Sequence, residues 1–199
     1  MRRLIQKLFG KPWAYRYLRG AFHFGVRRKP IEDVLELRPG DKVLDVGCGT
    51  GDYSVMVRSP GVRYLGIDIS PDYIRTARQD YGTDFRKFEV GDVRSLPYED
   101  KSFSKALYLG VMHHLSDADN RKVLEGIRRL TSSRVVIMDL SPGGWHVVNN
   151  VLCRFDRGEY VRTLEQQCEL IGSVLKVVSA RNYYVRSGIQ RYSLIVAQP

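Results

Sequence analysis

The sequence predicts a doubly wound α/β fold, with a seven-stranded, mostly parallel sheet and an antiparallel hairpin at the C-terminal end. Three observations lead to this prediction. Strand-like and helix-like segments alternate from residue 42 onwards, and a tight glycine-rich turn follows the first strand-like run. Several strand-like runs are apolar without a period of two, which is typical of strands covered on both faces.

The strand-like runs number seven, and the first five are separated by segments with helical or turn character. The last two, close together near the C-terminus, are expected to form the hairpin. The runs cover residues 42–46, 62–67, 84–89, 105–110, 134–139, 174–178 and 192–197.

Helices are expected on both sides of this sheet. Ser70 is a good N-cap, and Pro71 suits the first helical position after it. The connection over 91–103 is polar and is expected to fall short of a full helix. The predicted helices cover residues 30–37, 71–80, 117–130 and 161–171.

Length and composition indicate one globular domain. The 199 residues can bury a sizeable core. No apolar run approaches the roughly 20 residues that span a bilayer. The N-terminus has basic residues but lacks the features of a signal peptide. The three cysteines are far apart without metal-like spacing, so we expect reduced thiols, no metal and a cytoplasmic protein.

The net charge of +10 is concentrated near the N-terminus, where residues 1–31 contain nine of the 32 basic residues. The remaining 23 basic residues face 22 acidic ones, so the rest of the chain is nearly neutral. The same region is rich in aromatic residues. We therefore divide the chain into a basic, aromatic and helical arm over 1–40 and a globular domain over 41–199.

The glycine-rich turn reads Asp45-Val46-Gly47-Cys48-Gly49-Thr50-Gly51, and Asp68 closes the next strand-like run. Glycines without a Cβ let a backbone turn approach a ligand closely. A carboxylate beside such a turn can accept both hydroxyls of a ribose. The spacing differs from the G-x-G-x-x-G fingerprint of dinucleotide sites, and the sequence has no phosphate-binding P-loop. These features favour a nucleoside ligand.

Four segments in order resemble the motifs of class I S-adenosylmethionine-dependent methyltransferases. They are Asp45–Gly51, Gly66–Ser70, Gly91–Pro97 with Ser102-Phe103, and Leu109–Leu115. The chain looks most like the broad type 11 branch, which usually has Asp where this chain has Ser104. The resemblance implies a Rossmann-like fold and S-adenosyl-L-methionine as the cofactor.

The resemblance also implies roles for individual residues. The turn over 47–51 would lie under the methionine part of the cofactor, Asp68 would bind the ribose, and Asp92 would accept from the adenine amino group. Asp45 and the backbone of 109–110 would receive the methionine end. The residues assigned to the cofactor in this way are Asp45, Gly47, Cys48, Gly49, Gly51, Asp68, Ile69, Asp92, Val93, Leu109 and Gly110.

Methyl transfer from a sulfonium needs a base only if the acceptor must lose a proton. His113 and His114 follow a strand at the carboxyl edge of the sheet and are the best base candidates, with His113 preferred. Packing or capping of the adjoining turn is an equally good explanation of both. The weaker candidates are His23, Tyr160, Tyr183 and Tyr184.

The acceptor is expected to be a small or lipid-like molecule, because no Asn-Pro-Pro-Tyr-like segment follows the fourth strand. The arm would form a lid in which Trp13 and Tyr17 shield the reaction from water. An amphipathic helix over 4–9 could also contact a membrane surface peripherally. We do not expect nucleic acid as the partner, since the domain outside the arm is nearly neutral. The alternatives are a non-catalytic S-adenosylmethionine-binding module and an RNA methyltransferase that uses the arm.

Overall fold

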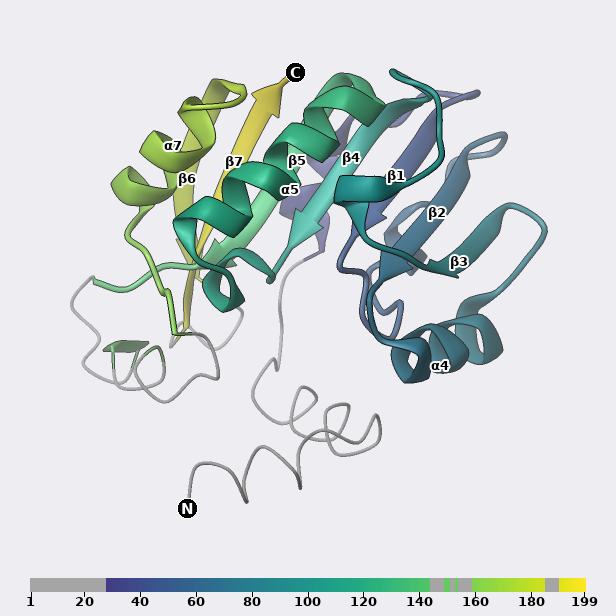
Figure 1. Ribbon diagram of the computed structural model, residues 1–199, viewed down its shortest axis with the longest axis horizontal. Coiled ribbons are helices and arrows are strands. Elements are labelled where there is room, and N and C mark those ends of the chain that lie inside the picture. Colours follow the sequence, from purple (N-terminus) through teal and green to yellow (C-terminus); the bar gives the residue numbers. More distant parts are fainter. Residues whose placement is uncertain (1–27, 144–148, 151–152, 154–158, 185–189) are drawn as a thin grey trace.

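The computed structural model describes residues 28–143, 149–150, 153, 159–184 and 190–199 (Figure 1). The predicted amphipathic helix of the arm, Trp13, Tyr17 and His23 lie outside the described residues.

The described residues form one seven-stranded sheet in the order β3-β2-β1-β4-β5-β7-β6. Strands β1 to β5 are parallel, and β7 runs antiparallel to both β5 and β6. This confirms the predicted fold class and its C-terminal hairpin. The strands are β1 (Lys42–Val46), β2 (Arg63–Asp68), β3 (Arg86–Val90), β4 (Phe103–Leu109), β5 (Thr131–Leu140), β6 (Lys176–Tyr184) and β7 (Arg191–Gln198).

Two strands extend beyond the predicted runs. β5 begins at Thr131, directly after a helix, and its first pair with β4 joins Thr131 to Phe103 ahead of a register shift. β6 continues to Tyr184 because β7 pairs with it along its whole length. β6 is the edge strand and is largely exposed, so its polar second half carries no apolar signal.

Helices cover both faces of the sheet. α5 (Asp117–Leu130) and α7 (Leu164–Gly172) lie in front of it in Figure 1, and α3 (Lys29–Leu35) lies behind. α4 (Pro71–Tyr81) shares the apolar layer of α3, whereas α5 and α7 share the opposite layer. The sheet is therefore covered on both faces, as its apolar strands predicted.

The helix boundaries follow local capping. The Ser70 hydroxyl accepts from the Tyr73 amide at 3.4 Å, and Pro71 begins α4. α7 begins with a reciprocal capping box between Thr163 and Gln166. The connection between β3 and β4 holds only a short 3-10 turn, η2 (Val93–Ser95), which confirms that this segment falls short of a full helix.

The described end of the predicted arm packs on the sheet. Ile31 and Leu35 of α3 are fully buried, and the Arg134 guanidinium donates to the Val34 carbonyl at 2.6 Å. Residues 29–35 thus share the core of the domain, while the boundary at residue 40 stays a prediction.

Ser104, the departure from the type 11 pattern, lies near the amino ends of the strands. Its hydroxyl donates to Asp41 at 2.7 Å and accepts from the Lys42 amide at 3.0 Å. The site of interest is at the opposite, carboxyl edge of the sheet.

Candidate functional site

The glycine-rich turn folds back over the end of β2. Gly47, Gly49 and Gly51 all have positive φ, at 73°, 55° and 81°. The amides of Gly47 and Cys48 both donate to the Ile67 carbonyl at 2.9 Å. A residue with a Cβ is strongly disfavoured in this left-handed backbone conformation, which explains the glycine at these positions.

Close packing adds a second reason for glycine in the turn. A Cβ on Gly47 would lie 2.6 Å from Val111 Cγ2, and a Cβ on Gly51 would lie 2.9 Å from the Phe88 ring. Cys48 is buried, and Gly47 is the partly exposed glycine of the turn. At Gly47 the turn therefore has backbone without a side chain at the surface.

Asp68 joins the turn to the ends of β2 and β3. Its carboxylate accepts from the Gly49 amide at 3.0 Å and from the Ser70 amide at 2.8 Å. Its own carbonyl accepts from the Gly91 amide at 3.1 Å. Burial raises the pKa of Asp68, and the two amide hydrogen bonds oppose that rise. The predicted turn and the predicted ribose carboxylate are therefore in direct contact.

Apolar surface is exposed next to Asp68. The Ile69 side chain is 76% exposed, and Val90, which pairs with Asp68 in the sheet, is 50% exposed. Exposed aliphatic side chains at a strand end offer a face on which a planar base can pack. Val93 is buried, so its predicted contribution is limited to the backbone.

Asp92 is held by a neighbour on its own turn. The Arg94 amide donates to its carboxylate at 3.0 Å, and the Arg94 Nε lies 2.9 Å from both oxygens. The hydrogen bond with the guanidinium lowers the pKa of Asp92. An adenine amino group would have to share this carboxylate with Arg94, and the adenine role of Asp92 stays a prediction.

Asp45 lies below the turn, at the end of β1. It is 1% exposed, and the Tyr64 hydroxyl donates to its Oδ2 at 2.6 Å. Burial, followed by the charge of Asp45, raises the pKa of Tyr64 well above its usual range. A role of Asp45 toward the cofactor ammonium stays a prediction.

Gly110, directly after β4, has open space where a side chain would project. Gly110 has a φ of 68°, and a Cβ on it would meet nothing within 4 Å. Its amide donates to the Met138 carbonyl of β5 at 2.7 Å. Gly110 therefore borders free space at the carboxyl edge, which fits the predicted position of the methionine end.

The two histidines after β4 differ in their surroundings. His113 is 7% exposed, whereas His114 is exposed and its ring lies 4.0 Å from the His113 ring. The His113 Nδ1 contacts Asp139 Oδ1, and the His113 amide donates to Asp139 Oδ2 at 3.0 Å. The Leu140 amide also donates to Asp139, at 2.6 Å. This buried pair was missed from the sequence, although Asp139 visibly closes the fifth strand-like run.

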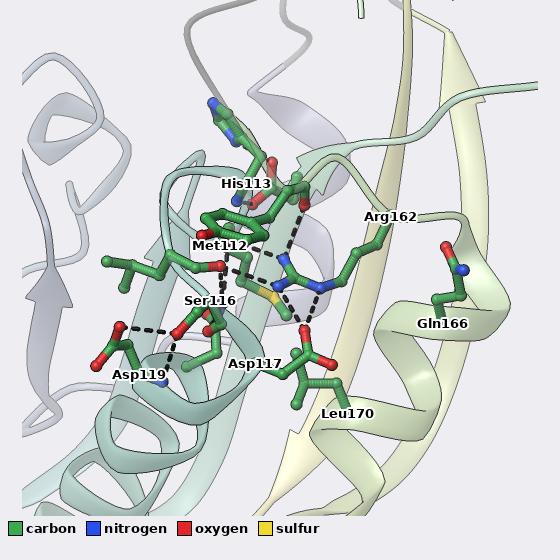
Figure 2. A network of polar contacts seen from close by, with 12 residues as sticks. Met112, His113, Ser116, Asp117, Asp119, Arg162, Gln166 and Leu170 are labelled. Atoms are coloured by element: carbon green, nitrogen blue, oxygen red, sulfur yellow. Dashed lines mark hydrogen bonds and ion pairs between the residues drawn. The ribbon is translucent and has the colours of Figure 1, made fainter.

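Arg162 clamps the loop that carries the histidines, as Figure 2 shows. It is 9% exposed. Its guanidinium donates to the carbonyls of Met112 at 3.0 Å and Leu115 at 2.9 Å. It also donates to the Tyr160 carbonyl at 2.8 Å and pairs with Asp117 at 2.6 Å. No motif in the sequence pointed to this residue.

A buried polar chain connects the Arg162 clamp to Asp139. The Gln167 side-chain amide donates to the Arg162 carbonyl at 2.9 Å and to the Leu140 carbonyl at 2.8 Å. The Ser193 hydroxyl contacts the Gln167 Oε1 and the Asp139 carbonyl. Two elements, α7 and β7, thus hold the end of β5, where Asp139 contacts His113.

The tyrosines that were weaker base candidates have structural contacts. Tyr160 is 42% exposed, and its amide donates to the His113 carbonyl at 3.0 Å. The Tyr183 hydroxyl contacts Met138 Sδ at 2.6 Å, and burial raises the pKa of Tyr183. Tyr184 ends β6. Within the described ranges, no cluster of three or more His, Cys, Asp or Glu residues could hold a metal ion.

The fold and the site together have the form of a doubly wound α/β domain with a candidate ligand site at the carboxyl edge of its sheet. Ligands of open α/β sheets bind at the carboxyl ends of the strands, where the strand order reverses. Here that point lies between β1 and β4, and the turn, Asp68 and Gly110 all border it.

Comparison with known proteins shows similarity to a methyltransferase family. Residues 43–134 match a family described as a methyltransferase domain. The chain is 32% identical to demethylmenaquinone methyltransferase of Thermotoga maritima over 120 residues, which is 58% of this chain and 50% of that protein. It is 37% identical to 27-O-demethylrifamycin SV methyltransferase of Amycolatopsis mediterranei over 92 residues, or 44% of this chain and 34% of that protein.

A solved S-adenosylmethionine-dependent methyltransferase from Methanosarcina mazei has the same fold. It superimposes with a TM-score of 0.69 at 20% identity, covering 85% of this chain and 96% of the other. The chain therefore has the fold of a class I methyltransferase, and residues 43–134 are similar to a methyltransferase domain, a match that the type 11 branch fits. The chain spans half or less of the length of the two curated relatives named above.

Proposed function

We propose that this chain transfers a methyl group from S-adenosylmethionine to a small-molecule or lipid-like acceptor. One observation carries the proposal. The Gly49 amide donates to Asp68 Oδ2 at 3.0 Å, so the glycine turn contacts the carboxylate predicted to bind the ribose, within the segment that matches a methyltransferase domain.

The residues at this edge fit the cofactor. The turn offers backbone without side chains to the methionine part, because a Cβ at Gly47 or Gly51 would collide with the core. Asp68 accepts the ribose hydroxyls, and Ile69 offers an exposed apolar face to the adenine. Hydrogen bonds to a charged carboxylate are the stronger kind.

The sulfonium supplies an activated methyl group, so the domain can act largely by alignment. Holding donor and acceptor in line can contribute on the order of 7–11 kcal/mol to the rate. The open space beside Gly110 lies at the methionine end of the predicted cofactor position. An acceptor approaching there would meet the methyl group near the loop that Arg162 holds.

The names of the relatives support a small acceptor. One relative is named for demethylmenaquinone and the other for a demethylrifamycin. The sequence agrees, since the Asn-Pro-Pro-Tyr-like segment common in enzymes that methylate bases and protein amides is absent after the fourth strand.

The arm and the cellular location belong to the same proposal. We propose that the basic N-terminal arm, predicted over residues 1–40, serves as a lid through Trp13 and Tyr17 and contacts a membrane surface when the acceptor is lipid-like. In the part of the chain that the structure covers, no helix is long and apolar enough to cross a bilayer. A cytoplasmic location stays a prediction.

Two measurements on the full chain test the proposal. Calorimetry with S-adenosylmethionine measures binding, and incubation with methyl-labelled donor and a cell metabolite extract measures transfer. Binding together with a labelled small molecule supports the enzyme. If the chain binds S-adenosylmethionine but transfers no methyl group to the extract or to RNA, it is a non-catalytic module. Label on RNA, with salt-sensitive binding, supports an RNA methyltransferase. An absence of binding refutes the cofactor assignment.

A further inference from the structure

A second pocket lies between α5 and α7. Its volume is about 350 Å³, which is within the range of small-molecule sites. None of its described lining residues belongs to the predicted cofactor site. Figure 2 shows the Arg162–Asp117 ion pair between the two helices. The pocket is lined by Asp117 and Arg121 of α5, by Gln166, Glu169 and Leu170 of α7, and by Tyr160, Val161 and Arg162 before α7.

The charges of this pocket balance, but two of them have no ion-pair partner. Asp117 Oδ1 accepts from both Nε and a terminal nitrogen of Arg162, at 2.9 and 2.6 Å. Arg121 lies one turn after Asp117 on α5, the spacing of a helical ion pair. Within the described residues, however, neither Arg121 nor Glu169 forms an ion pair. An unpaired cation on α5 and an unpaired anion on α7 therefore border one cavity.

The remaining wall of the pocket is apolar. Leu170 is buried and Val161 is half-buried. The Tyr160 ring is held by Arg162, whose guanidinium carbon lies 5.7 Å from the ring centroid, although Tyr160 remains 42% exposed. A ligand of this pocket would therefore meet aliphatic and aromatic surface between the two unpaired charges.

A zwitterion with an apolar side chain matches this lining. A carboxylate can pair with the planar Arg121 guanidinium through two hydrogen bonds, and an ammonium can pair with Glu169. An anion alone would leave Glu169 unpaired, and a cation alone would leave Arg121 unpaired. One carboxylate, one ammonium and an apolar side chain are the groups of an apolar α-amino acid.

Arg162 connects the pocket with the turn after β4. Its guanidinium donates to the carbonyls of Met112 and Leu115, at the two ends of the turn that holds both histidines. Gly110, beside the predicted methionine end, lies two residues before Met112. The Asp117 side chain is 58% exposed, so water weakens its ion pair with Arg162. A ligand that covers this ion pair would strengthen it and hold the turn more firmly.

We propose that this pocket is a second ligand site, which takes an apolar α-amino acid and is coupled to the cofactor site through Arg162. The Arg121 guanidinium binds the carboxylate of the ligand, and Glu169 binds its ammonium. Binding in the pocket does not depend on methyl transfer, whereas the coupling rests on the cofactor assignment proposed above. A crevice between two helices that holds only water would show no saturable binding.

Direct titration tests the site without cofactor. The full chain is titrated with L-leucine, L-methionine, L-phenylalanine and L-tryptophan and followed by calorimetry. The tightest of them is compared with two analogues, the carboxylic acid that lacks its ammonium and the amine that lacks its carboxylate. Each analogue should bind at least about 10-fold more weakly, because it loses a charged pair. No saturable binding by any of the four, or equal binding of the amino acid and both analogues, overturns the inference.

Substitutions assign the ligand to this pocket. Arg121→Gln and Glu169→Gln should each weaken amino-acid binding at least about 10-fold, with unfolding unchanged because both side chains are exposed. The matched controls Lys122→Gln and Glu125→Gln change exposed charges of α5 that do not line the pocket and should keep wild-type affinity. Wild-type affinity in both pocket variants would place the ligand elsewhere and overturn the inference.

The affinity for S-adenosylhomocysteine, measured with and without the amino acid, tests the coupling. The amino acid should tighten it about 5-fold or more, and S-adenosylhomocysteine should tighten the amino acid by the same factor. Asp117→Asn removes the charge that faces Arg162 but neither partner of the ligand, so it should keep amino-acid binding and lose the coupling. No coupling in wild type, or equal coupling in Asp117→Asn, refutes the connection through Arg162. Absence of cofactor binding refutes the proposed function, while amino-acid binding without cofactor still decides the site.

Discussion

Replacement of Asp68 gives the sharpest test of the cofactor site. Its carboxylate accepts two backbone amides, from Gly49 and Ser70, at 3.0 and 2.8 Å. Each oxygen retains acceptor capacity for a ribose hydroxyl. Hydrogen bonds to a charged group contribute about 1.5–3 kcal/mol. Asp68→Ala should therefore raise the dissociation constant of S-adenosylmethionine by about 10-fold to 150-fold.

The same substitution also disturbs the turn, so affinity and stability are measured together. Asp68→Ala leaves the Gly49 and Ser70 amides without their acceptor, whereas Asp68→Asn keeps the volume and one acceptor oxygen. Calorimetry gives the affinity, and thermal unfolding without ligand gives the stability. Asp84→Ala, an exposed carboxylate outside the site, is the matched control. Unchanged affinity in both Asp68 variants would remove this residue from the site and refute the reasoning.

Three further perturbations have expected outcomes. Gly47→Ala should destabilise the fold by about 2 kcal/mol or more in denaturant unfolding, because φ is 73° and the new Cβ collides with Val111. The control Gly172→Ala, with open space around it, should not destabilise the fold. Equal unfolding midpoints for the two variants would contradict the packing argument. Arg162→Met should lower the free energy of unfolding by about 3 kcal/mol or more, since each buried carbonyl left without a donor costs roughly 1–3 kcal/mol. The exposed control Arg121→Met should leave it nearly unchanged. Equal stability of Arg162→Met and wild type would refute the structural role of Arg162. Cofactor affinity measured by calorimetry should fall on acidification as Asp68 gains a proton. Because burial raises the Asp68 pKa, the fall should begin at a higher pH than for an ordinary aspartate, and an identical pH dependence in Asp68→Asn would exclude Asp68 as its cause.

The local parts of the site could be predicted from the sequence. The turn over 47–51, Asp68 and Gly110 belong to short segments in which glycine spacing and strand ends carry the information. The structure places them at one edge of the sheet, as predicted. The roles of individual residues toward the cofactor stay predictions, and Asp92 illustrates why. Its partner in this structure is Arg94, two residues away, and the sequence did not suggest that pair.

The non-local parts of the site could not be predicted. Asp139 meets His113 across 26 residues, and Arg162 reaches the Met112 carbonyl across 50 residues. Neither contact leaves a periodic or spaced signal in the chain. β6 was similarly predicted too short, because its second half is held by pairing with β7 and not by an apolar pattern of its own.

The sequence by itself determined the order of strands and helices, the glycine turn and the acids that end successive strands, because hydrophobic pattern, capping and backbone freedom act over a few residues. Only the tertiary structure decided which of the two histidines is buried against a carboxylate and which arginine holds their loop. Those choices depend on how β4, β5 and the segment before α7 come together. They arise when distant segments must satisfy one another's buried polar groups.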